Sequence, residues 1–294
     1  MLLSVRVLLS ISLLERGSGF LQSVHKVDSI SLRGVNQVRR SRDLVEVRLG
    51  VELLGEVPRD VACSIGAAGG AAMWLKIWTT LASNGVINSR LSRKIIHCGS
   101  APLFLFVWPF YSDAPSARLI AAIVPLLNLG RLLAAGVNAN AKGPQELVTA
   151  VSRSGDPKEV LKGPLIYCIV LVFATLLWRN STAAVVAISQ MAVGDGVADI
   201  VGRRFGQSAK WPNSEKSYAG SLAFVFGASI ATFVLLRWFE FMACLAPLPF
   251  DTVTLFARIF LISIVCALVE LIPGLDDNIS VPFVGAFLGT YVIK

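Results

Sequence analysis

The sequence has little charge, little histidine and no paired cysteines. Only 16% of its 294 residues are charged, whereas a soluble globular domain carries about 25%. Its two histidines and five cysteines are scattered, without the spacing of a zinc site or a redox motif. Because 54% of the residues are hydrophobic, a disordered chain, a collagen and a disulfide-stapled scaffold are all excluded. We expect the cysteines to be small core residues.

The sequence also lacks the familiar nucleotide-binding and hydrolytic motifs. It contains no G-x-x-x-x-G-K-[ST], and after Gly194 and Gly196 a dinucleotide fingerprint would need a third glycine where Asp199 stands. The H-R-D and D-F-G motifs of protein kinases, H-E-x-x-H and G-x-S-x-G are missing as well. These absences exclude P-loop enzymes, Rossmann dehydrogenases, protein kinases and the common zinc and serine hydrolases.

What the sequence does have is long apolar runs. Its mean hydropathy is +0.67, and about 20 apolar residues in a helix suffice to cross a bilayer. From residue 60 onward, apolar runs alternate with short polar links: 61–82, 95–111, 118–137, 163–178, 181–194, 219–236, 255–272 and 279–293. The shorter runs must extend into neighbouring residues or form broken helices. We predict an all-α fold, a polytopic transmembrane helix bundle with about seven spans, in a range of about six to eight.

The first 55 residues differ from the rest. They combine basic residues and serines and contain only Glu15 and Asp28 as acids before Asp43. Such a composition is typical of an organellar transit peptide. A secretory signal or uncleaved anchor is the alternative, because residues 2–14 are mostly apolar, and a misassigned gene start is a third. We therefore expect a transit peptide or disordered leader at 1–55 and one transmembrane domain at 60–294.

The basic residues are distributed unevenly among the polar links. Counting through the eight runs places links 83–94, 138–162, 195–216 and 273–278 on one face of the membrane. This face carries most of the lysine and arginine, so the positive-inside rule makes it cytosolic, or stromal in a plastid. Topology thus explains the net charge of +8, and we expect no nucleic-acid partner.

The stretch GDGVADIVGRRFG at 194–206 is the densest chemical signal. In a helix, Asp195, Asp199 and Arg203 would share one face. Two carboxylates there suit Mg²⁺, which binds few carboxylates together with substrate phosphates, and Gly194 and Gly196 would let a ligand approach the backbone. The alternative is a polar helix end with an ion pair between Asp199 and Arg203.

A second signal, EKSYAGS at 215–221, stands directly before an apolar run. Lys216, the Ser217 hydroxyl and the free amides of the next helix, at Gly220 and Ser221, would meet at a helix N-terminus, which attracts anions. An ordinary N-cap at Ser217 is the alternative.

Two further stretches fall on the same membrane face. Lys94 and His97 are three residues apart, on one helical face at the boundary, where an interfacial anchor and a buried histidine are the alternatives. Asp276 and Asp277 stand in a turn, for which simple solvation is the alternative.

These motifs together resemble the plant phytol kinase and farnesol kinase family of polyprenol kinases. Dolichol kinases and CTP:phosphatidate cytidylyltransferases are more distantly similar. The resemblance covers residues 60–294 and rests on LSRKIIH (91–97), KEVLKGPLIY (158–167), GDGVADIVGRRFG (194–206), EKSYAGS (215–221), and LVELIP with DDNISVPF (268–283).

The resemblance implies a kinase that transfers a phosphoryl group from CTP, or another nucleoside triphosphate, to the hydroxyl of phytol. Farnesol and geranylgeraniol are the alternative acceptors. The expected partners are the isoprenoid alcohol, the nucleotide and membrane lipid, in the chloroplast envelope or, alternatively, the endoplasmic reticulum membrane. A multispanning anion transporter is the alternative of another class; it would bury paired charges at mid-membrane, for which Lys76, Arg131, Arg258 and Glu270 are the candidates.

For the kinase, we expect Asp195 and Asp199 to hold Mg²⁺ and Lys216 to act on phosphate. We expect His97 to accept the alcohol proton. The other residues expected at the nucleotide are Lys94, Arg203, Arg204, Ser217, Gly220, Ser221 and Asp277.

Overall fold

The computed structural model describes residues 55–137, 147–148, 150–152, 155–212 and 214–293. These residues are helical apart from turns, links and a single bridge between Lys210 and Ser217. The all-α prediction is confirmed for this part of the chain. The predicted leader, up to residue 54, lies outside it.

The described helices follow the predicted apolar runs closely. In chain order they are a first helix, Gly55–Ser83, then α3 Ser89–Val107, the 3₁₀ turn Trp108–Phe110, α4 Ala117–Val137, α6 Pro157–Val160, α7 Gly163–Trp178, α8 Thr182–Ser189, the π-helical turn Gln190–Gly194, α9 Asp195–Phe205, α10 Tyr218–Phe241, α11 Thr252–Val269 and α12 Asp277–Val292.

Six helices of the described part are long and apolar enough to cross a membrane. This number is within the predicted range of six to eight spans, and α3 and α12 correspond to the two remaining apolar runs. The short run at 181–194 continues through the π turn into α9, giving one 24-residue helix, Thr182–Phe205. The GDG motif therefore lies inside a spanning helix rather than in a link.

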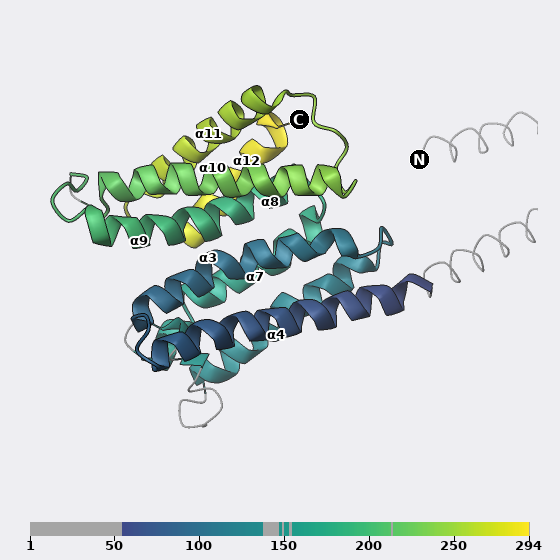
Figure 1. The fold of residues 1–294 in the computed structure, drawn as a ribbon, viewed down its shortest axis with the longest axis horizontal. Coiled ribbons are helices and arrows are strands. Elements are labelled where there is room, and N and C mark those ends of the chain that lie inside the picture. Colours follow the sequence, from purple (N-terminus) through teal and green to yellow (C-terminus); the bar gives the residue numbers. More distant parts are fainter. Residues whose placement is uncertain (1–54, 138–146, 149, 153–154, 213, 294) are drawn as a thin grey trace, which may run out of the picture. The chain divides into compact units, whose positions relative to one another are not determined.

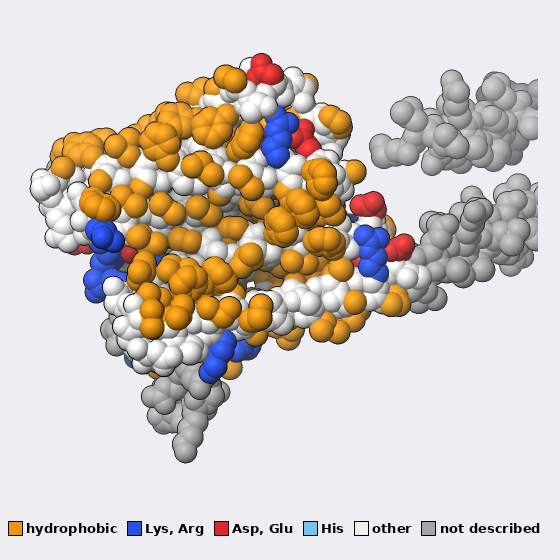
Figure 2. All heavy atoms as spheres, viewed as in Figure 1, with side chains coloured by type: hydrophobic (Ala, Val, Ile, Leu, Met, Phe, Trp, Pro, Cys, Tyr) orange, Lys and Arg blue, Asp and Glu red, His pale blue; other side chains and the backbone are white. Residues whose placement is uncertain are grey.

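Helix α8 lies at the centre of the bundle. Its residues from Ala183 to Ser189 are all buried, and it packs against α12, while α10 packs along α9 and α11, and α4 along α7 (Figure 1). The outer helices expose apolar side chains instead, as on α10, where Leu222, Phe226, Ile230 and Val234 recur every four residues and are more than half exposed. Figure 2 shows such side chains spread over the sides of the helices, with most charges near their ends. This is the surface expected of helices in contact with lipid.

Two glycines on either side of Asp195 allow neighbouring helices to approach α9. A Cβ at Gly194 would lie 2.6 Å from the Phe224 ring of α10, and one at Gly196 would overlap Cys98 Sγ of α3. The prediction that these glycines admit a ligand was therefore wrong: they admit α10 and α3. Their close packing brings the polar end of α3 next to Asp195.

Candidate active site

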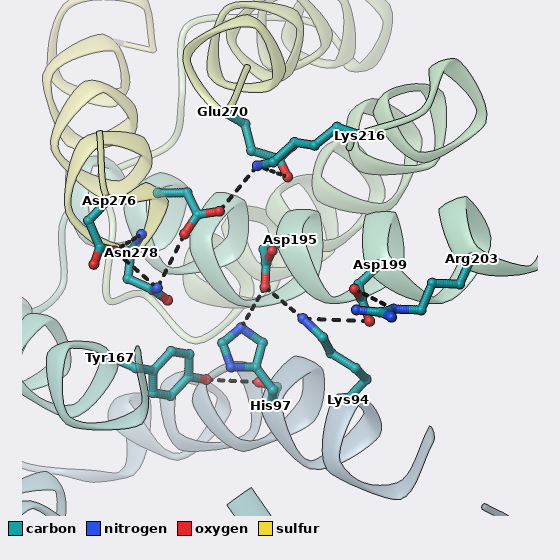
Figure 3. A network of polar contacts seen from close by, with 11 residues as sticks. Lys94, His97, Tyr167, Asp195, Asp199, Arg203, Lys216, Glu270, Asp276 and Asn278 are labelled. Carbon is teal, nitrogen blue, oxygen red and sulfur yellow. Dashed lines mark hydrogen bonds and ion pairs between the residues drawn. The ribbon is translucent and has the colours of Figure 1, made fainter. Parts of the chain in front are cut away.

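Five of the residues singled out in the sequence meet at one end of the bundle. Lys94 and His97 come from α3, Asp195 begins α9, Lys216 precedes α10, and Asp277 begins α12. All five line the same cavity, and Figure 3 shows the side chains of the first four turned toward the cluster. Helices distant in sequence thus place cations and carboxylates together at the predicted membrane face.

Asp195 is the centre of the first half of this cluster. Its Oδ2 accepts a hydrogen bond from Lys94 Nζ at 3.2 Å and lies 3.3 Å from His97 Nε2. In the described part of the chain, Nε2 is buried and has no hydrogen-bond partner, although it lies within ion-pair distance of Asp195. His97 itself lines the cavity beside Asp195.

Tyr167 of α7 fixes the backbone of α3 at His97. Its hydroxyl accepts a hydrogen bond from the Ala101 amide at 3.2 Å and donates one to the His97 carbonyl at 2.9 Å. These two backbone groups pair directly in a regular helical turn, so Tyr167 bridges them just before Pro102, and its ring also packs on the imidazole. The position of His97 is thereby tied to α7.

Lys216 is the centre of the second half. Its Nζ donates to Glu270 Oε1 at 2.7 Å and to Asp277 Oδ2 at 3.1 Å. Burial lowers the pKa of Lys216, but the two carboxylates outweigh it and hold that pKa above its usual value. Burial raises the pKa of Glu270, and repulsion from Asp195 and Asp277 raises it further. The pKa therefore lies above its usual value despite the nearby lysine. One cation is thus shared between two acids.

Three carboxylates of the described residues could hold a cation together. Ligand oxygens of Asp195, Glu270 and Asp277 lie within 4.8 Å of one another. Lys94 pairs with Asp195, Lys216 pairs with Glu270 and Asp277, and His97 lies beside Asp195, so these three carboxylates outnumber the two lysine charges by one. All-oxygen carboxylate sites suit hard divalent cations such as Mg²⁺, so the donor set fits this ion.

Glu270 is the site residue that the sequence analysis did not assign. It was named as a possible mid-membrane charge of a transporter, yet it ends α11 beside Asp277. The signal that could have found it is its place in the LVELIP stretch, directly before the turn that carries Asp276 and Asp277.

Asp199 does not belong to the group of three carboxylates. Its Oδ1 accepts from Arg203 Nε at 2.8 Å, and its Oδ2 lies 3.9 Å from Lys94 Nζ. The predicted common helical face of Asp195, Asp199 and Arg203 exists, but Asp199 is neutralised by Arg203. Its role as a metal ligand stays a prediction.

The other residues expected at the nucleotide do not line the cavity. Ser217 is buried and caps α10, because its Oγ accepts from the Gly220 amide at 3.1 Å. Ser221 accepts a hydrogen bond from Trp211, and Arg204 lies over the ring of Phe205. The structure thus shows capping and packing at these positions, and their contacts with a nucleotide, like that of Arg203, stay predictions.

A buried polar network lies next to the π turn that precedes Asp195. Gln190 is fully buried, and its Nε2 donates to Ser263 Oγ at 2.9 Å and to Thr232 Oγ1 at 3.3 Å. π turns are often found at functional sites. Here the turn and its ties to α10 and α11 set the orientation in which Asp195 emerges from α8.

The cavity has a volume of about 1400 Å³ and two chemically different parts. The charged cluster forms one end. The rest is lined mostly by apolar and small side chains of the first helix, α3, α4 and α7, among them Gly66, Ala71, Phe104, Val124 and Leu171, with a few polar ones such as Asn128 and Arg131. A site of this kind can bind a molecule with a polar head and a long apolar tail.

The chain is similar to several curated plant proteins. It is 39% identical to the probable phytol kinase 1 of Glycine max, over 76% of this chain and 74% of that protein. It is 36% identical to phytol kinase 1 of Arabidopsis thaliana, over 84% and 80% of the two chains, and 32% identical to the farnesol kinase of the same plant, over 73% and 69%. All three are named chloroplastic. No family model and no solved structure matches the chain.

Proposed function

The chain belongs to the family of plant phytol and farnesol kinases, and we propose that it transfers the terminal phosphoryl group of CTP to the hydroxyl of phytol in a chloroplast membrane, the envelope. The single observation that supports this best is the cavity, whose charged end continues into an apolar interior. A prenyl alcohol is dissolved in the bilayer, whereas a triphosphate must stay in water, so the reaction requires a site of this kind at the membrane boundary.

The relatives speak against the transporter alternative, since they are named kinases. The placement of the charges agrees with this. Glu270 ends α11 and pairs with Lys216, which precedes α10, so this pair lies at helix ends, whereas a transporter would gather paired charges at mid-membrane in broken helices.

The charged cluster supplies the groups that phosphoryl transfer needs. Asp195, Glu270 and Asp277 would hold Mg²⁺, which when bound neutralises charge on the triphosphate. Lys94 and Lys216, already turned into the cavity, are placed to attract phosphate oxygens. Phosphoryl transfer depends mainly on such positioning and electrostatic stabilisation.

His97 is placed to handle the proton of the acceptor alcohol. The hydroxyl proton moves to Nε2 as the alcohol oxygen bonds to the γ-phosphorus; the bond from that phosphorus to the bridging oxygen breaks, and CDP leaves. The supporting observations are that His97 lines the cavity, that its Nε2 has no hydrogen-bond partner among the described residues, and that Tyr167 holds its backbone.

The proposal is tested with the purified full-length protein in lipid nanodiscs. The protein is supplied with CTP labelled in the γ-phosphate, Mg²⁺ and phytol, farnesol, geranylgeraniol or no alcohol. We expect label in a lipid phosphate with phytol and none without alcohol. Parallel reactions with ATP, GTP and UTP test the donor. No lipid phosphate with any alcohol and any donor would contradict the kinase.

We expect His97→Gln to lower turnover by about 10²-fold or less and to leave the KM for CTP nearly unchanged. A loose transition state makes weak demands on a base, so the loss is moderate. Steady-state kinetics with each substrate varied in turn measures both constants. A variant that loses CTP affinity at unchanged turnover would make His97 a phosphate ligand, and wild-type kinetics would make it a packing residue.

A further inference from the structure

The apolar part of the cavity runs along α3, away from the charged cluster. Among its lining residues are His97 near the cluster and Leu103, Phe106 and Val107 farther along the helix. From His97 to Val107 the helix rises by roughly 15 Å, and from Lys94 to Val107 by roughly 20 Å, at about 1.5 Å per residue. The cavity is therefore deep enough to accept a long chain lengthwise.

The first helix runs antiparallel to α3 and lines the same depth. Near the cluster, Ser92 Oγ donates to the Trp78 carbonyl at 2.8 Å. At the other end, the Ser64 and Tyr111 hydroxyls are hydrogen-bonded at 3.0 Å. This register puts Gly66 level with Val107, at the distal end of the cavity.

The depth of the cavity corresponds to a particular number of isoprene units. An extended chain gains about 1.2 Å per bond, as in an extended polypeptide, so each unit of four main-chain bonds adds roughly 5 Å. Since the hydroxyl lies at His97, the chain length counts from that residue. The three-unit alcohol farnesol would reach about 15 Å, to the level of Val107, and the fourth unit of a four-unit alcohol would pass beyond that level.

Gly66 leaves open the space that this last unit needs. It lines the cavity, and a Cβ added there would meet no atom within 4 Å. A bulky side chain would therefore project into free space at the distal end without displacing a neighbour. We propose that the cavity measures the length of the alcohol, and that Gly66 admits the terminal isoprene unit of diterpenoid alcohols. This inference rests on the kinase function proposed above.

The test compares two acceptors that differ by one isoprene unit, geranylgeraniol and farnesol, in wild type and in Gly66→Leu. We expect the kcat/KM for geranylgeraniol, divided by the kcat/KM for farnesol, to be about tenfold or more lower in the variant than in wild type. Filling a hydrophobic pocket discriminates between substrates by about 10–200-fold. Phytol should lose as much as geranylgeraniol. Retained farnesol activity shows that the variant is folded.

Two matched variants make the test specific. Gly69→Leu adds the same side chain on the same helix, also where nothing lies within 4 Å, but Gly69 does not line the cavity, so the ratio should stay at the wild-type value. Gly70 lines the cavity roughly 6 Å nearer the cluster, so Gly70→Leu should lower the activity with both alcohols.

The outcomes separate the inference from the function on which it rests. If the wild type phosphorylates none of geranylgeraniol, farnesol and phytol, the proposed function fails and the inference with it. If the wild type is active but Gly66→Leu changes both alcohols equally, or neither, the length measurement at Gly66 is wrong while the kinase stands.

Discussion

Replacing Asp195 by asparagine is expected to reduce turnover by roughly 10²–10³-fold, the loss seen when one preorganised stabilising group is removed from a reacting centre. This carboxylate is contacted by Lys94, lies beside His97 and belongs to the group of three acids. Asparagine keeps the shape but not the charge, so both the attraction of Lys94 and one cation ligand are lost. Initial rates at saturating CTP, Mg²⁺ and alcohol measure the effect.

The control for this variant is Asp251→Asn. Asp251 caps α11 by accepting a hydrogen bond from the Thr254 amide, and it does not line the cavity. Asparagine caps a helix about as well as aspartate, so this variant should keep wild-type activity and thermal stability. Near-normal turnover in Asp195→Asn would reduce Asp195 to a structural ion-pair partner of Lys94.

Much of the fold could be predicted because hydrophobic runs determine where spanning helices form. The boundary at 194 was the exception. The apolar run ends at 194 and residues 195–216 were predicted as a link, yet the π turn and α9 continue the helix to Phe205. Glycine weakens a helix when considered alone, but here Gly194 and Gly196 allow α10 and α3 to pack closely, and tertiary packing decides the outcome.

For the site, each sequence motif predicted only the chemistry of its own residues. Charged residues near the boundaries of the apolar runs, such as Lys94, Lys216 and Asp277, stood out because charge near hydrocarbon is costly. The partners could not be read off in the same way. That Lys216 bonds Glu270 rather than an incoming phosphate, and that Asp199 pairs with Arg203, depends on how α9, α10 and α11 pack.

Glu270→Gln is expected to raise the Mg²⁺ concentration needed for half-maximal activity by about 10–100-fold or more, because outer-shell partners of a metal already have effects of that size. Glutamine can still accept the hydrogen bond from Lys216, so the link between the α10 and α11 ends is retained, while the negative charge near Asp195 and Asp277 disappears. The measurement is a Mg²⁺ titration of initial rates at fixed CTP, repeated with Mn²⁺.

The matched control is Glu240→Gln. Glu240 is a partly buried, ion-paired glutamate, bonded to Arg237 and to the Leu248 amide, and unlike Glu270 it does not line the cavity. It should therefore leave the Mg²⁺ titration unchanged, whatever it does to thermal stability. If Glu270→Gln lowers turnover at every Mg²⁺ concentration by the same factor, Glu270 serves only to position Lys216, and the cation is held without it.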